Sequence, residues 1–295
     1  MSKNRNLKYQ FLNAIEKNFR EGVNKHSLKK EHSKKGNEIF SYSQRKNLID
    51  LSSNFANYMK ENHSEVKFVK DVNKEHIQEF LNSKREVCSQ ATLDNYQAQF
   101  NKLESVVNYT YNTNVDYHSI KTISIKNGGG KIRNDMLSKQ DYNKLMQSTN
   151  TNFTNALSLS YNFGLRASEC AKVQGKDFRN DGLHIVDSKG KRSRIIPYED
   201  KQQIALKEKF ENMQRICNCR TQSLQQAFNR AKQSLGINSK SDFHASRKAY
   251  ATNKFKEYRE QGEDVQQSLD HVSKNLGHNE NRNKLMQAYI CCDIK

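Results

Sequence analysis

The sequence predicts a mainly α-helical protein of two domains, with one small β-hairpin or sheet in the second domain. Three observations indicate this fold class. The 295 residues include one proline and twelve glycines, so few tight turns and helix breaks are expected. The 13 Tyr and 14 Phe residues recur with other apolar residues at helical spacing. Residues 183–197 alone have the character of paired strands.

Four apolar stripes of helical spacing occupy the first half of the chain. They predict helices over residues 4–22, 42–59, 72–81 and 91–111. Together the stripes predict a compact helical domain over residues 1–126, with the option that the 4–22 helix is a separate element. A lysine-rich, glycine-containing stretch over residues 25–37 interrupts the pattern and is expected to be a loop or a segment that contacts a partner.

A basic, glycine-rich stretch separates the two halves. Three consecutive glycines end at Gly130 among cationic residues, which predicts a linker over residues 127–133 and a second domain over residues 134–295. In the second domain, helices are expected at about 138–147 and 152–163, near Ala167, and from about residue 200 onward. Two short apolar runs, 183–186 and 194–197, flank a basic turn and predict a hairpin that the only proline closes.

The charge balance favours a polyanionic partner. Lys and Arg number 50 against 32 Asp and Glu, giving a net charge of +18. Both halves are basic, with 21 cationic against 14 anionic residues in 1–130 and 29 against 18 in 131–295. A protein that wraps a polyanion needs such a distribution. A basic surface also provides solubility, so charge alone does not decide for nucleic acid.

Composition argues against membrane, secreted and zinc-finger proteins. No stretch approaches the roughly 18 consecutive apolar residues that a membrane span needs. The basic amino terminus leads into no apolar signal region. The six cysteines have neither zinc-site nor disulfide-framework spacing, so we expect no metal and reduced thiols. These features predict a cytoplasmic protein.

Five short patterns in the second half carry the candidate chemistry. In chain order they contain Arg166 with Glu169, Lys189, His244 with Arg247, His278 after Leu-Gly, and Tyr289. Each has an ordinary explanation when taken alone. The Arg166–Glu169 pair is typical of a surface ion pair, and Lys189 of a solvated turn. The two histidines and Arg247 are compatible with helix caps or core hydrogen bonds, and Tyr289 with core packing.

Their order changes this interpretation. Gly-Leu-Arg-x-Ser-Glu, a hairpin ending in Arg-x-Ile-Pro, His-x-x-Arg, Leu-Gly-His and a late Tyr form an ordered series that resembles the tyrosine recombinases, or phage-type integrases. The resemblance extends over most of the chain. It implies a helical core-binding domain followed by a mixed α/β catalytic domain, which act as a homotetramer on paired sites in double-stranded DNA. It also implies a nucleoid-associated enzyme of a bacterial-type cell, without a cofactor.

The residue types suit the cleavage of a phosphodiester. Two permanently charged guanidiniums, Arg166 and Arg247, can hold the non-bridging oxygens without a metal. By the resemblance, Tyr289 attacks phosphorus to form a 3′-phosphotyrosyl link, and His244 accepts its proton or orients the site. A hairpin lysine, Lys189, would protonate the leaving 5′ oxygen. His278 would donate to the phosphate, and Glu169 would hold Arg166.

Basic residues outside this set are candidates for DNA contacts. The phosphate backbone attracts Lys and Arg regardless of base sequence. We expect such contacts from Lys29, Lys30, Lys34, Lys35, Lys131, Arg133, Lys191, Arg192, Arg194 and Lys248.

Two alternatives stay open. The same chemistry serves a type IB topoisomerase-like or telomere-resolving enzyme, and the fold without catalysis would give a DNA-binding accessory factor. Two departures concern the family pattern: Lys248 stands where a second histidine is common, and Tyr289 lies eleven residues after His278, two more than is usual. Tyr250 and Tyr258 are therefore competing candidates for the nucleophile.

Overall fold

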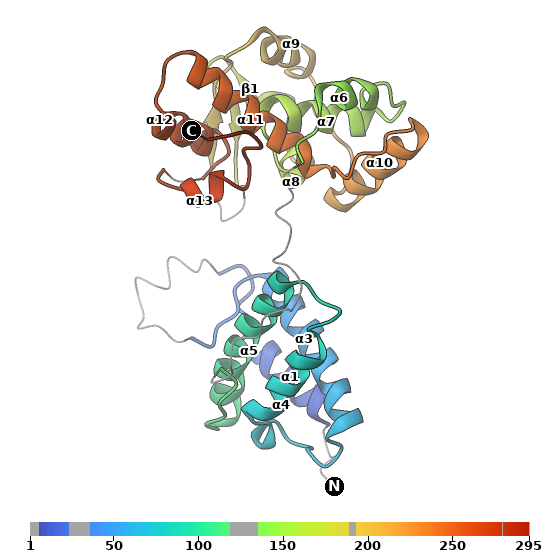
Figure 1. The fold of residues 1–295 in the computed structure, drawn as a ribbon, viewed down its shortest axis with the longest axis vertical. Coiled ribbons are helices and arrows are strands. Elements are labelled where there is room, and N and C mark those ends of the chain that lie inside the picture. The colour runs from blue at the N-terminus through green and yellow to red at the C-terminus, as the bar shows by residue number, and fades with distance from the viewer. Residues whose placement is uncertain (1–5, 24–35, 119–134, 189–192, 279, 295) are drawn as a thin grey trace. The chain divides into compact units, whose positions relative to one another are not determined.

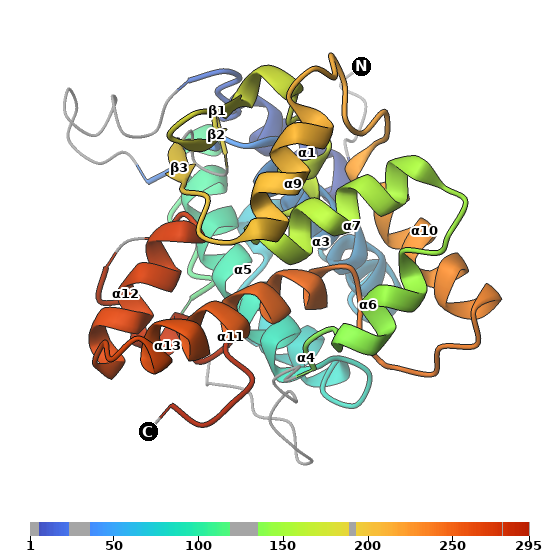
Figure 2. The same cartoon turned by 90° about the horizontal axis from the view of Figure 1, so that it is seen from above.

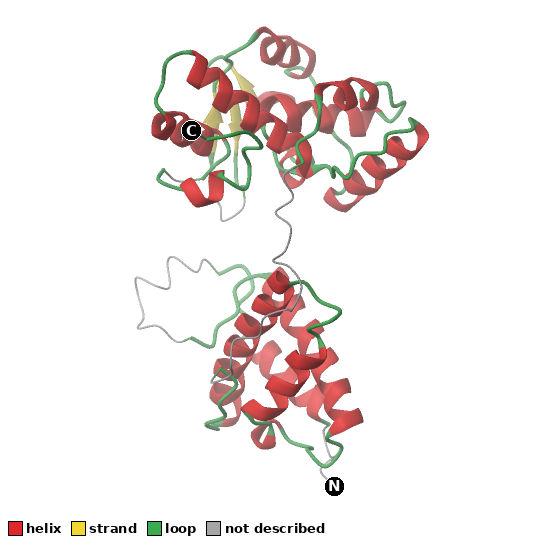
Figure 3. Cartoon of the chain, viewed as in Figure 1, coloured by secondary structure: helices red, strands yellow, loops and turns green. Residues whose placement is uncertain are grey.

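The computed structural model describes residues 6–23, 36–118, 135–188, 193–278 and 280–294. The chain divides into two compact units, residues 1–131 and 132–295, each with its own core (Figure 1). The predicted linker at 127–133 lies outside the described residues, so the boundary there stays a prediction. The mainly helical fold class is confirmed, and all strands of the described residues lie in the second unit (Figure 3).

The first unit is a bundle of helices, as expected. Its described α-helices are α1 (Leu7–Lys17), α3 (Tyr42–Asn62), α4 (Lys74–Ser83) and α5 (Gln90–Tyr111). Each helix begins where an Asn or Ser side chain accepts a hydrogen bond from a first-turn amide, namely at Asn6, Ser41, Asn73 and Ser89. Helix α1 packs on α3 and α5, so it belongs to the bundle and is not a separate element.

An aromatic cluster fills the core of this unit. The ring of Phe55 lies 5.3 Å from Phe80 and 5.2 Å from Phe100, both edge to face, and 6.1 Å from Phe11. All four rings are completely buried. Edge-to-face pairs contribute beyond the burial of their area, so these four residues fix how α1, α3, α4 and α5 pack.

A short backbone pairing closes the segment that follows α1. The predicted helix at 4–22 ends earlier, at Lys17, and Phe19 forms a parallel bridge with Ile39. The Arg20 amide donates to Ile39 at 2.8 Å, and the Ile39 amide donates to Asn18 at 2.9 Å. Asn37 donates to the Asn18 side chain at 2.7 Å, inside the protein. This pairing, the neck of the segment, joins the chain before and after residues 24–35.

The second unit places helices around a small antiparallel sheet. The sheet has the order β1-β2-β3, with β1 at Phe178–Arg179, β2 at Gly182–Ile185 and β3 at Arg194–Ile196. The hairpin was predicted, whereas β1 was not. The helices are α6 (Lys139–Leu145), α7 (Thr151–Phe163), α8 (Ala167–Cys170), α9 (Lys201–Phe210), α10 (Thr221–Ser234), α11 (His244–Glu260), α12 (Val265–Asn275) and α13 (Asn283–Met286).

Helices α7 and α11 form the centre of this unit. They pack along one another (Figure 2), and most residues of both are buried. Helix α11 also packs against α12, so little of its surface is left for solvent. The start of α11 carries His244 and Arg247, which are thereby fixed by the best-packed part of the fold. No helix in the described ranges is both long and apolar enough to cross a membrane.

Candidate active site

Five of the six predicted catalytic residues gather in one place. Arg166 precedes α8, His244 opens α11, and Arg247 follows one turn later. His278 lies just after α12. Tyr289 lies in the turn after α13, whereas the sequence predicted a final helix there. The sixth, Lys189, lies outside the described residues, as do Lys191 and Arg192.

The carboxylate of Glu169 binds two of the basic residues, Arg166 and Arg194. Its Oε2 accepts the Arg166 backbone amide at 2.8 Å, and its Oε1 accepts from the Arg166 guanidinium at 2.8 Å. Arg194 donates to both carboxylate oxygens, at 3.0 and 2.9 Å, and the Ser188 hydroxyl donates as well. The carboxylate is 4% exposed. The Arg166–Glu169 contact is therefore a buried anchor and not the surface ion pair that the two residues alone suggest.

Opposing effects act on the charge of Glu169. Burial alone would raise its pKa, because desolvation disfavours the carboxylate. The hydrogen bonds and charge of Arg194, with those of Ser188 and the Arg166 amide, outweigh burial and hold the pKa of Glu169 well below its usual range. The group is therefore anionic at neutral pH, and its charge secures the position of Arg166.

Arg247 is completely buried, although it is a cation. Its Nη1 donates to the carbonyl of Gly164, and its Nη2 donates to that of Leu276 at 2.7 Å. Its Nε has no hydrogen-bond partner among the described residues. Burial, with Arg166 close by, lowers the pKa of Arg247 to about 10, so it stays charged at pH 7. A buried cationic donor without an acceptor is costly unless a ligand supplies one.

His278 contacts the first arginine. Its Nε2 lies 3.3 Å from Nη2 of Arg166, and because a guanidinium has no acceptor, His278 accepts there. Burial and the charges of Arg166 and Arg247 lower the pKa of His278 to about 4. The ring is thus neutral at pH 7, and its proton resides on Nδ1, which remains available as a donor.

The half-buried ring of Tyr289 is surrounded by the other candidates. Its centroid lies 5.4 Å from the ring of His244 and 5.7 Å from that of His278. The guanidinium carbon of Arg247 lies over the Tyr289 ring at 5.4 Å. Desolvation and the Arg247 charge lower the pKa of His244, so this histidine is neutral at pH 7 and able to accept a proton.

The two competing tyrosines lie elsewhere in the core. Tyr250 is 2% exposed, and burial raises its pKa far above the usual value. Tyr258 directs its hydroxyl to the carboxylate of Glu199, at 2.8 Å. Neither hydroxyl is available to a DNA strand in this arrangement, which favours Tyr289.

Two residues expected to contact DNA are turned inward. Arg194 has 8% of its side chain exposed because the buried carboxylate of Glu169 requires a cationic partner. Lys248 is 8% exposed because its helix, α11, is covered by neighbouring helices. In this arrangement both side chains are buried, and the expectation that they contact DNA stays a prediction. The remaining expected contacts lie outside the described residues, at Lys29, Lys30, Lys34, Lys35, Lys131 and Arg133.

Sequence reasoning missed the role of Arg194 and that of Ser188. A signal for Arg194 existed: in a strand, residues two apart share a face, so Arg194 lies on the same side as buried Ile196. An arginine on a core-facing position requires a carboxylate, and Glu169 was the available candidate. No comparable signal marked Ser188.

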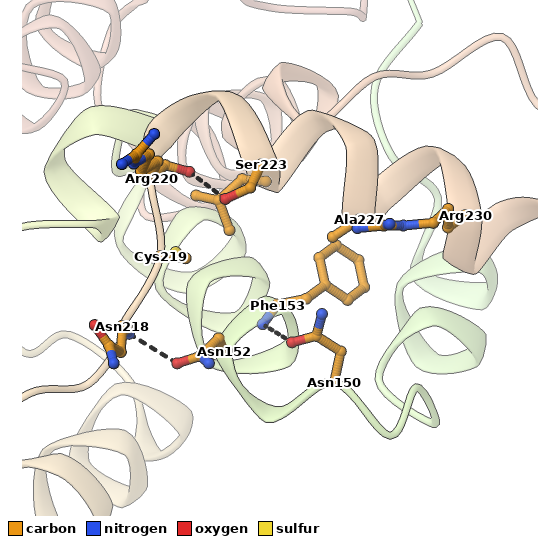
Figure 4. Close-up of a pocket in the computed structure, with 10 residues that line it drawn as sticks. Asn150, Asn152, Phe153, Asn218, Cys219, Arg220, Ser223, Ala227 and Arg230 are labelled. Carbon is orange, nitrogen blue, oxygen red and sulfur yellow. Dashed lines mark hydrogen bonds between the residues drawn. The ribbon is translucent and has the colours of Figure 1, made fainter.

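A second polar surface lies away from these residues, between α7 and α10. It is a hollow of about 530 Å³ (Figure 4). Arg220 and Arg230, both exposed, line it together with Asn150 and Asn152 at the start of α7. Helix α10 begins here without a side-chain cap. Its first amides and the two guanidiniums together favour anions.

A possible set of metal ligands occurs in the first unit. Within the described ranges, the donor atoms of Glu104, Asp116 and His118 lie within 4.8 Å of one another. The 2.8 Å ion pair between Glu104 and His118 accounts for the approach of these groups. They do not belong to the candidate active site.

Comparison with known proteins points to one family. Residues 135–280 match the model of the phage integrase family. Among solved structures, the chain resembles a lambda integrase dimer bound to a COC′ core site, with 17% identity and a TM-score of 0.65 over 95% of this chain and 76% of that one. It also resembles XerH site-specific recombinase bound to a palindromic difH substrate, with 14% identity and a TM-score of 0.64 over 99% of this chain and 95% of that one. A third similar structure is a lambda integrase tetramer bound to a Holliday junction, with 16% identity and a TM-score of 0.63 over 96% of this chain and 76% of that one. No curated protein matches the sequence.

Proposed function

Residues 135–280 make this chain a member of the phage integrase family, a tyrosine-type site-specific DNA recombinase, and we propose that it acts through a 3′-phosphotyrosyl intermediate. The observation that carries the proposal is the convergence of Arg166, Arg247 and Tyr289. Arg247 lies over the Tyr289 ring, and Arg166 contacts His278, whose ring lies 5.7 Å from that of Tyr289. Two guanidiniums and a tyrosine are the groups needed to bind a phosphodiester and to attack it. The Nε of Arg247 has no hydrogen-bond partner among the described residues, so a phosphate oxygen that reached it would supply the missing acceptor.

The first half-reaction transfers a phosphoryl group from DNA to the protein. The Tyr289 oxygen forms a bond to phosphorus as the bond from phosphorus to the 5′ oxygen breaks. Neutral His244, beside the Tyr289 ring, takes the phenolic proton, and Lys189 gives a proton to the 5′ oxygen. Arg166 and Arg247 stabilise the charge that develops on the non-bridging oxygens, and Nδ1–H of His278 adds a further donor.

The second half-reaction reverses the first with a different strand. The ester to Tyr289 conserves the energy of the broken bond, so a 5′ hydroxyl from another duplex can attack it. This exchange would integrate, excise or resolve a mobile element. The lambda integrase structure on a Holliday junction is a tetramer, which supports four protomers of this chain on two sites.

Duplex binding would use basic surface outside the catalytic residues. Arg220, Arg230 and the uncapped start of α10 form an anion-binding surface in the second unit. The lysine pairs at 29–30 and 34–35 would provide further phosphate contacts from the first unit. Such contacts give most of the affinity and a steep dependence on salt.

Capture of the covalent intermediate tests this function. Nicked duplexes tiled across the DNA that flanks the gene are incubated with the full chain, because the nick lets the 5′ product diffuse away. We expect an SDS-resistant adduct whose tryptic phosphopeptide contains Tyr289. Tyr289→Phe should form no adduct and bind the same duplex within a few-fold of the natural chain, because only a hydroxyl is lost.

The contrary results are equally clear. An adduct that persists in Tyr289→Phe would move the nucleophile to another tyrosine. Relaxation of supercoiled DNA without any joined products would favour the topoisomerase-like alternative. Tight binding without an adduct on any duplex would favour the accessory factor.

A further inference from the structure

Arg194 connects three parts of the second unit. It is the first residue of β3. In the sequence, the candidate acid Lys189 lies five residues before it. Its guanidinium makes the two bonds to Glu169 described above. Its Nε donates to the carbonyl of Asn275 at 2.8 Å, at the end of α12. One side chain therefore links the hairpin, the Arg166 anchor and the turn that carries His278.

The contact with this turn is tight on both sides. A Cβ atom on Gly277 would come within 2.9 Å of Nη1 of Arg194 and 3.1 Å of its Cδ. Gly277 has a φ of +72°, a conformation that glycine adopts at little cost. The Leu-Gly-His turn thus closes directly over the Arg194 guanidinium, and His278 is the next residue.

All three nitrogens of the Arg194 guanidinium donate a hydrogen bond to a fixed acceptor. Two carboxylate oxygens and one carbonyl accept from it, and its side chain is 8% exposed. A lysine could not reproduce this arrangement, because an ammonium lacks the planar fork that binds a carboxylate through two parallel bonds. The geometry is that of a positioning group rather than that of a DNA contact.

We propose that Arg194 is a positioning residue for strand cleavage. It holds Glu169, and through Glu169 it fixes the position of Arg166 relative to the hairpin and to His278. The proposal rests on the function proposed above. Arg194 itself touches no substrate atom. Its loss would leave Arg166 bonded to Glu169, but the carboxylate would no longer be tied to β3 and to the end of α12, so the position of Arg166 would be less well fixed.

The charges around Glu169 give this proposal a pH signature. Arg166 faces the carboxylate from the start of α8, Arg194 from β3, and Arg247 from α11 at 3.8 Å, with the hydroxyl of Ser188 and the buried thiol of Cys170 beside them. Without Arg194, burial of the carboxylate is less well compensated, so the pKa of Glu169 rises. Protonated Glu169 would then release Arg166 as the pH falls.

The test measures covalent cleavage by Arg194→Met and Arg194→Lys on a nicked duplex that the natural chain cleaves. We expect Arg194→Met to slow cleavage by about 10–100-fold, the usual effect of removing a group that orients a functional residue. Its DNA affinity should stay within about 3-fold, because no phosphate contact is lost. Arg194→Lys should recover part of the rate. Arg179→Met, an exposed arginine on β1, is the matched control and should cleave normally.

Two further measurements separate positioning from general damage. As the pH falls, cleavage by Arg194→Met should decline at a higher pH than cleavage by the natural chain, because the pKa of Glu169 is higher in the variant. Both proteins contain His244 and His278, so the comparison isolates the effect of Glu169. In the double variant with Glu169→Gln, cleavage should be no slower than in Glu169→Gln alone, because Arg194 acts through that carboxylate.

Three results would overturn the proposal. They are normal cleavage by Arg194→Met, a parallel loss of binding and cleavage, and rate losses that multiply in the double variant. Absence of an adduct from the natural chain would instead refute the proposed function. In that event the guanidinium ¹⁵N signal of Arg166 in the DNA-free protein decides: it should broaden in Arg194→Met, and an unchanged signal contradicts the proposal.

Discussion

Replacing Gly164 by alanine should disturb both the stability and the chemistry of the second unit. Gly164 ends α7 with a φ of +64°, and its carbonyl accepts a hydrogen bond from Arg247. A Cβ atom there would lie 2.4 Å from Cδ1 of Tyr250 and 2.9 Å from Cδ2 of Leu276. Both neighbours are buried side chains with little room to move, since Tyr250 is 2% exposed and Leu276 fully buried.

The cost of Gly164→Ala has two parts. A left-handed backbone costs an alanine about 1–2 kcal/mol more than a glycine. Crowding in a packed core adds about 1–3 kcal/mol. The free energy of unfolding should therefore fall by about 2–5 kcal/mol. For a unit of this size the melting temperature should then fall by roughly 5–15 °C.

Gly236 provides a matched control for the backbone part. Its φ is +63°, and a Cβ atom there would meet nothing within 4 Å. Gly236→Ala should cost only about 1–2 kcal/mol in thermal or urea unfolding and should leave cleavage unchanged. Gly164→Ala should also slow cleavage, because the carbonyl that anchors Arg247 moves. Equal losses of stability in the two variants would refute the crowding argument.

The remaining predictions concern protons, metals and acid. Lys189→Ala should slow cleavage of ordinary DNA by about 10²–10⁴-fold. A substrate with a 5′-bridging phosphorothiolate should restore the rate, because its thiolate leaves without a proton. If this substrate rescues Lys191→Ala and not Lys189→Ala, Lys191 is the acid. Cleavage should be equally fast in EDTA, because guanidiniums stabilise the phosphate charge, and loss of activity restored by magnesium would contradict this mechanism. The pKa of His278 is lowered to about 4 from 6.5, so between these values the unfolded chain binds a proton that the folded chain does not, and stability falls with falling pH. His278→Gln should lose less stability than the natural chain between pH 6.5 and pH 4, as measured by urea unfolding; an identical decline would contradict the lowered pKa.

Most helices were predictable because their apolar stripes are long and regular. The stripe at 91–111 matches α5 to within one residue at its start, and 152–163 does so for α7. The largest error occurred at 4–22, where Phe19 continues the helical spacing but pairs with Ile39 instead. A two-residue strand such as β1 is too short to show alternation, so its pairing depends on the neighbouring strand.

The candidate site was predictable as an ordered set of residues but not as a geometry. The motifs identified Arg166, Arg247 and Tyr289, and the structure brings them together. The sequence placed Arg194 among the solvated cations of a basic turn, because four cationic residues occur within six positions. The spacing of Arg194 from Ile196 indicated a shared strand face, but only the fold shows which buried carboxylate Arg194 meets there.

The neck formed by Phe19 and Ile39 gives the first unit a site for exchange of sequence. Since the chain is paired on both sides of residues 24–35, insertions there leave the helical core unchanged. In general, doubling the number of residues between two paired stretches of chain costs only about 0.6 kcal/mol in closure entropy. Natural variation or engineering can therefore replace the sequence between the two paired stretches, and with it the four lysines proposed to contact DNA, while the core of the first unit stays the same.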